Sequence, residues 1–188
     1  MDVLLSRLIN QCIAQDIIKS EDVDIYRYGF DLLAFSIVNI VLLLSLGFII
    51  GKVNVVMFIL LCYIPLQSLG GGYHAKTHTR CSLIMIFEMA IAIAAVEFLK
   101  PYILYCCACL SMACIFILAP VQHPNAPFGP VFEKKMKRFV RRFGVIIFLV
   151  MLLTNRAFAQ ISSCIAVSLI LAGISLVLAA KGAEVDSN

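Results

Sequence analysis

Long runs of apolar residues, separated by short polar segments, occupy most of the chain. The runs cover residues 32–50, 53–69, 82–99, 102–119, 143–154 and 161–180. A helix that crosses a bilayer needs about 20 apolar residues, and all runs except the fifth approach this length. The fifth reaches it only by extending through Ala159 with Arg156 placed at the membrane interface. We therefore predict an all-α bundle of six transmembrane helices that forms one membrane domain over residues 1–188.

The first 31 residues show a different pattern. Over residues 1–19, apolar side chains recur every three to four positions among polar neighbours, which is typical of an amphipathic helix on a membrane surface. An acidic stretch at residues 21–24 separates this helix from the first long run. The pattern predicts an amphipathic N-terminal segment over residues 1–31 rather than a further span.

Composition excludes a soluble domain. Hydrophobic residues make up 62% of the chain and charged residues 14%, whereas soluble domains average roughly 45–50% apolar and about 25% charged. The net charge is +4, but the basic residues are not interleaved with exposed aromatics, so we expect no nucleic-acid partner. Seven of the eight cysteines lie within or beside apolar runs, where a free thiol packs as a small hydrophobe. We expect neither a disulfide framework nor a cofactor.

The basic residues predict the topology. With the N-terminus in the cytoplasm, twelve of the 15 lysines and arginines are cytoplasmic, and Lys52, Lys100 and Arg156 are outside. This agrees with the positive-inside rule and predicts a multi-pass protein of the cell membrane. The turn at residues 70–81 and a basic linker at residues 120–142 are then both cytoplasmic. The linker could contact anionic membrane lipids, at about 1 kcal/mol per basic residue, or dock an acidic peptide segment.

The turn at residues 70–81 is the richest in reactive side chains. It holds three glycines, two of the three histidines and one cysteine, and the glycines interrupt the helix before it. A helix that starts near His74 would set His74 and Cys81 on one face, with His78 one turn from Cys81. Either histidine could then reach the sulfur. An imidazolium, the helix dipole and Arg80 all favour a thiolate, which is an activated nucleophile.

Two other interpretations of these residues stay open. On one helix face, His74, His78 and Cys81 could bind zinc, with Glu88 as a fourth ligand. A carboxylate such as Glu88 is costly inside a bilayer, so it is expected to face the bundle interior. There it could form a helix-packing hydrogen bond, support catalysis, or relay protons with the histidines in a small transporter or exporter.

The turn resembles the accessory gene regulator B (AgrB) family, the membrane-embedded cysteine endopeptidases of Gram-positive quorum sensing. The matching residues are Gly71-Gly72-Tyr73-His74-Ala75 and then Cys81. A second match is the segment Ala119–Pro127, which is similar to the proline- and asparagine-containing stretch that the family carries after its fourth hydrophobic segment. A basic linker follows in both, and the resemblance covers nearly the whole chain.

The resemblance implies specific roles. Cys81 would be the nucleophile and His74, rather than His78, the general base. The substrate would be an AgrD-like precursor signalling peptide, cleaved on its C-terminal side. The N-terminal part would be held as a thioester on the enzyme, and an internal cysteine of the peptide would displace it to form a cyclic thiolactone.

The chain departs from the family at Gln67, where many members have arginine. Binding of an acidic substrate tail, which that arginine would serve, is then expected of the basic linker, and Gln67 could instead donate to an oxyanion. The expected supporting residues are Gln67, Gly72, Ser82 and Glu88, and the expected substrate contacts are Arg80, Lys134 and Lys135. Small residues such as Ala172 and Gly173 also allow close packing in a homodimer.

Overall fold

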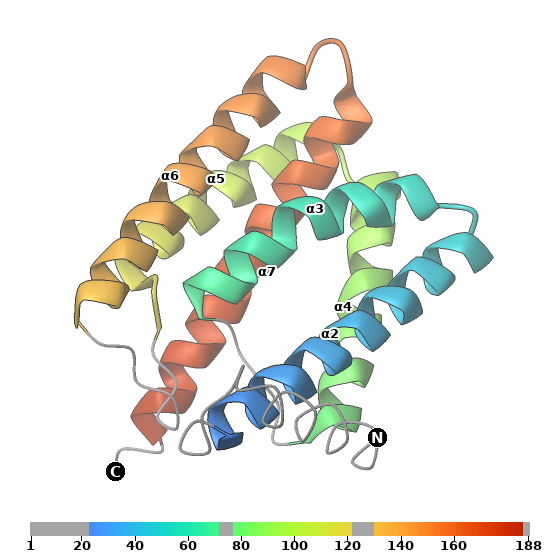
Figure 1. Ribbon diagram of the computed structural model, residues 1–188. Coiled ribbons are helices and arrows are strands. Elements are labelled where there is room, and N and C mark those ends of the chain that lie inside the picture. Colours follow the sequence, from blue (N-terminus) through green and yellow to red (C-terminus); the bar gives the residue numbers. More distant parts are fainter. Residues whose placement is uncertain (1–22, 72–76, 122–129, 186–188) are drawn as a thin grey trace. The chain divides into compact units, whose positions relative to one another are not determined.

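The computed structural model describes residues 23–71, 77–121 and 130–185 (Figure 1). Over these ranges the chain forms helices and no strand, which confirms the predicted all-α class for this part. The predicted amphipathic helix over residues 1–19 lies outside the described residues. The helices are α2 (Val23–Ile49), α3 (Val53–Gly70), α4 (His78–Phe98), α5 (Pro101–Leu118), α6 (Pro130–Thr154) and α7 (Ala159–Val185).

Within the described ranges, five helices are long and apolar enough to cross a membrane. They correspond to five of the six predicted runs. Their ends fall where the sequence interrupts a helix: Gly51 turns the chain after α2 with a φ of +72°, and Pro101 starts α5 at a position that needs no backbone donor. The five segments are Gly29–Ile49, Val53–Gly70, His78–Phe98, Pro101–Leu118 and Ala159–Lys181.

Helix α6 joins part of the predicted basic linker to the fifth apolar run. Residues 130–142 form its first half and residues 143–154 its second. The apolar half rises only about 18 Å, well short of a hydrocarbon core about 30 Å thick. The extension through Ala159 does not form, because α6 ends at Thr154 and a new helix, α7, begins at Ala159. The sixth span thus stays a prediction that requires the basic half of α6 to enter the interface.

The chain divides into two compact units, residues 1–42 and residues 43–188. In the described part of the first unit, polar side chains of α2 bond to their own helix. Ser36 Oγ donates to the Leu32 carbonyl and Asn39 Nδ2 to the Phe35 carbonyl, both at 2.8 Å. Bonds of this kind satisfy polar groups without a partner from another helix.

In the second unit, α7 is the central helix, and α3, α4, α5 and α6 pack against it (Figure 1). In the α7 span 67% of the residues are buried, whereas in the α4 span 22% are buried. Small residues on α7 allow the close approach of its neighbours. A Cβ on Gly173 would lie 2.8 Å from Ser111 Cβ on α5, and Ser168 Oγ donates to the Ile59 carbonyl on α3 at 3.2 Å.

Candidate functional site

The predicted turn follows α3, whose last residue is Gly70. Gly70 is buried, and a Cβ built on it would lie 3.7 Å from Leu176 Cδ2 of α7 and 3.8 Å from Val140 Cγ1 of α6. The basic half of α6 therefore lies beside the end of α3. This arrangement places the predicted turn and the predicted basic segment at the same end of the second unit.

The first residue after α3 contacts the segment that follows α5. Gly71 has a φ of +73°, in the left-handed region, and the Val121 N–H donates to the Gly70 carbonyl at 2.9 Å. A Cβ on Gly71 would overlap the Val121 carbonyl oxygen. Only glycine fits here, because a side chain would meet both backbone strain and a fixed backbone atom. Two stretches that lie fifty residues apart in the sequence thus meet at this turn.

Cys81 lies in the first turn of α4. Thr77 caps this helix in an extended conformation, with φ of −134° and ψ of 145°, and its hydroxyl accepts the Arg80 N–H at 3.4 Å. The Thr77 carbonyl accepts the Cys81 N–H at 3.0 Å. The half-buried thiol is therefore close to the helix N-terminus, the end at which the helix dipole stabilises negative charge.

The expectation of a helix starting near His74 is wrong, because α4 begins only at His78. Thr77 is extended, so residues on either side of it do not share one continuous helix face. Of the three ligands proposed for one helix face, α4 as described contains His78 and Cys81. His74 and Gly72 themselves lie outside the described residues.

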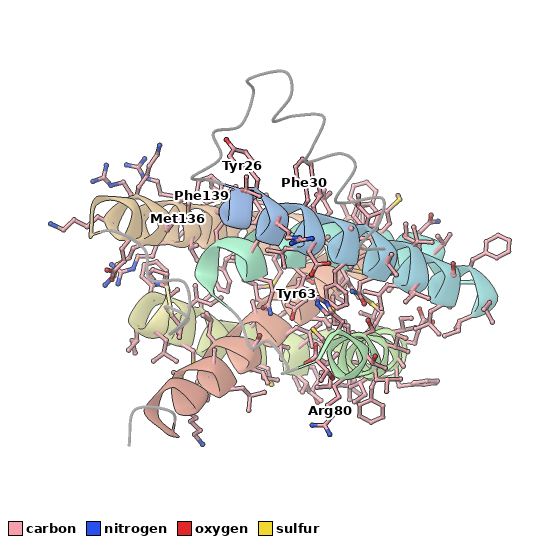
Figure 2. All side chains as sticks on the ribbon, turned by 60° about the horizontal axis from the view of Figure 1, so that its bottom comes forward. Tyr26, Phe30, Tyr63, Arg80, Met136 and Phe139 are labelled. Atoms are coloured by element: carbon pink, nitrogen blue, oxygen red, sulfur yellow. The ribbon has the colours of Figure 1, made fainter. Side chains whose placement is uncertain are left out.

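Tyr63 connects several polar groups near Cys81. Its side chain is only 6% exposed, and its hydroxyl hydrogen-bonds the Ser175 side chain on α7. Cys81 and Glu88 both lie close enough to interact electrostatically with the Tyr63 hydroxyl. In Figure 2, Tyr63 lies among the helices, whereas Arg80 extends away from them. Tyr63 thus bonds to one hydroxyl group and lies within electrostatic range of a thiol and a carboxyl group.

Sequence reasoning did not predict a role for Tyr63. One signal could have revealed it: Tyr63 precedes Gln67 by four residues and so lies on the same face of α3. Gln67 is half-buried, and its Oε1 atom has no hydrogen-bond partner among the described residues. This face of α3 therefore carries two polar side chains in a largely apolar run.

The other predicted site residues are distributed over two helices. Ser82 and Glu88 are half-buried on α4, and Arg80 is exposed. Lys134 and Lys135 are exposed on α6. No group of three histidine, cysteine or acidic side chains that could hold a metal ion occurs in the described ranges.

A second polar cluster lies at the far end of α4. Lys52 Nζ pairs with Glu97 Oε2 at 2.7 Å, and Gln160 Nε2 donates to Glu97 Oε1 at 3.3 Å. These contacts join the turn before α3, the end of α4 and the start of α7. They connect α4 to these elements at the end opposite to Cys81.

Comparison with known proteins gives one positive result. The family model described as "Accessory gene regulator B" matches residues 5–176. No curated protein and no solved structure matches the chain. The family match, together with the five long apolar helices, identifies a multi-pass membrane protein.

Proposed function

We propose that this chain, which belongs to the accessory gene regulator B family, is a membrane-embedded cysteine endopeptidase. Membership of the family implies a part in processing a quorum-sensing peptide. The proposed substrate is a precursor peptide made in the cytoplasm and cleaved on its C-terminal side. The proposed product is a cyclic thiolactone.

In the proposed reaction, the Cys81 sulfur attacks the carbonyl carbon of the scissile peptide bond. His74 takes the thiol proton and gives it to the leaving amine as the C–N bond breaks, which leaves a thioester on Cys81. The sulfur of an internal cysteine of the bound peptide then attacks this thioester. The ring closes, and Cys81 regains a proton.

The observation that best supports this proposal is the position of Cys81. The thiol is half-buried in the first turn of α4, and it lies within electrostatic range of the buried Tyr63. The other described cysteines differ from it in exposure or position: Cys62 and Cys164 are buried, Cys106, Cys107 and Cys109 are exposed on α5, and the half-buried Cys114 lies far from the start of its helix. A nucleophile must be accessible to its substrate on one side and packed against the protein on the other. The half-buried thiol of Cys81 meets both conditions.

A site at the membrane interface suits a thioester intermediate. Conversion of an amide to a thioester is energetically uphill, so the intermediate must survive until the second thiol attacks. Restricted water slows its hydrolysis, and the tethered thiol of the same peptide attacks at a high effective concentration. The proposed chemistry therefore benefits from the half-buried position of Cys81.

The test is co-expression of the chain with a short precursor peptide encoded beside it, followed by mass spectrometry. We expect Cys81→Ser to abolish cleavage, and the matched variant Cys106→Ser, on the exposed face of α5, to retain it. A precursor whose internal cysteine is changed to alanine should accumulate as an adduct on Cys81. Unimpaired cleavage by Cys81→Ser would end the peptidase proposal.

The histidine assignment is tested in the same assay. We expect His74→Ala to be inactive and His78→Ala to remain active. Equal loss from both variants would argue for metal ligation or for a different base. Function that survives Cys81→Ser but is lost in Glu88→Gln would instead favour a proton-coupled transporter.

A further inference from the structure

Five basic side chains line a hollow of about 350 Å³ on the first half of α6. Their spacing places them on one face of the helix, and none of the lining residues is acidic. Lys135, the remaining basic residue of this half, does not line the hollow. Figure 2 shows nitrogen-tipped side chains that project from α6 near Met136 and Phe139. The lining residues are Lys134, Lys137, Arg138, Arg141 and Arg142.

Arg141 is held in place by α5. Its Nη2 atom donates to the Phe116 carbonyl at 2.5 Å, and its guanidinium carbon lies 5.6 Å from the centroid of the Phe116 ring. The buried Arg141 Nε has no hydrogen-bond acceptor in the described part of the chain. The remaining N–H groups of a guanidinium held in this way are suited to bind the oxygen of an anion.

The same face of α6 becomes apolar beyond the basic residues. Val145, Leu149 and Leu152 follow Arg141 at positions that continue its helix face, and they are 38%, 51% and 50% exposed. From Arg141 to Leu152 the helix rises about 16 Å. That length is close to half of a hydrocarbon core about 30 Å thick, the depth of one leaflet.

We propose that this face of α6 binds an anionic phospholipid. The phosphate of the head group occupies the basic hollow, and an acyl chain lies along Val145, Leu149 and Leu152. Charge complementarity selects an anionic head group, and the exposed apolar strip of one leaflet's length selects a lipid over a soluble acidic peptide. The site contains no proposed catalytic residue, and the lipid experiment does not depend on peptide processing, although Lys134 is also one of the expected substrate contacts.

The experiment measures lipid retention by the full chain reconstituted in vesicles of phosphatidylcholine and phosphatidylglycerol. The protein is extracted, and native mass spectrometry compares the two bound lipids. The test variant is Lys137→Gln with Arg138→Gln, which leaves the anchored Arg141 unchanged. The control is Lys135→Gln with Lys181→Gln, which removes the same charge from exposed positions outside the hollow.

We expect the unchanged chain and the control to retain phosphatidylglycerol. In the test variant, the preference for phosphatidylglycerol over phosphatidylcholine should fall roughly 30-fold. An equal loss in both variants would overturn the site in favour of diffuse surface charge. The absence of any preference in the unchanged chain would also overturn it. Binding of a soluble glutamate-rich peptide in place of phosphatidylglycerol would assign the hollow to an acidic partner instead.

Discussion

Among single residues, Gly71 is the most restricted position that the structure describes in the predicted turn. Its left-handed backbone and its contact with the Val121 carbonyl oxygen both exclude a side chain. We expect Gly71→Ala to lower the free energy of unfolding by about 3 kcal/mol, since backbone strain of about 1–2 kcal/mol adds to overpacking. Peptide processing should fall with it. Thermal unfolding of the purified chain in detergent, followed by circular dichroism, measures the loss.

A matched control for this variant lies in the turn after α2. Gly51 has nearly the same φ, +72°, but a Cβ there meets no atom within 4 Å. Gly51→Ala should therefore lower the free energy of unfolding only by the backbone strain, about 1–2 kcal/mol. Equal losses for the two variants would show that the Val121 contact contributes nothing.

The residues of the candidate site differ in how well the sequence predicts them. Cys81 can be found from the sequence because its neighbours are polar. Tyr63 cannot be found so readily, since a tyrosine within an apolar run looks like any other packing residue. The contact between Gly71 and Val121 joins distant segments, and no local pattern encodes it.

At the level of helices, the most extensive packing among the described elements is between α5 and α7. Gly173→Ala should lower the free energy of unfolding by about 1–3 kcal/mol, because the new Cβ would lie 2.8 Å from Ser111 Cβ. The double variant with Ser111→Gly removes the clashing atom and should recover most of the loss. Thermal unfolding in detergent checks both variants, and a failure of the rescue would place the strain elsewhere.

The helices themselves are largely predictable, because a long apolar run must satisfy its backbone internally within a membrane. The predicted run at residues 53–69 matches α3, Val53–Gly70, almost residue for residue. Hydropathy does not predict the first half of α6, since residues 130–142 are too basic to resemble a span and yet form a helix. The start of α4 was also misplaced, because an extended cap at Thr77 depends on local backbone geometry that apolar periodicity does not report.

For the whole molecule, the main question is whether α6 crosses the membrane. Its first half lies beside Gly70, and the turn after it lies beside α5, where the Tyr105 hydroxyl donates to Asn155 Oδ1 at 2.8 Å. Tyr105 is near the start of α5, and Phe116, whose carbonyl accepts a hydrogen bond from Arg141, is near its end, so α6 runs along the length of this helix. A helix that runs beside an apolar helix along its length supports the six-span prediction.

The six-span prediction places both ends of the chain in the cytoplasm. An epitope tag after Asn188 should then be protected from protease in right-side-out vesicles and cleaved only after permeabilisation. A tag at the N-terminus serves as the control, since it is expected inside in either case. Cleavage of the C-terminal tag in intact vesicles would show that α6 does not cross.

Glu97 contacts Lys52 and Gln160 at one end of α4, so a tilt of the helix would occur around this end. Cys81 lies sixteen residues from Glu97 along this helix, a distance of about 24 Å. A tilt of about 10° around this end would move the thiol by about 4 Å, and the low burial of α4 offers little resistance. The Lys52–Glu97 ion pair thereby holds only the far end of α4, and the separation between the thiol and Tyr63 would change with the tilt of the helix.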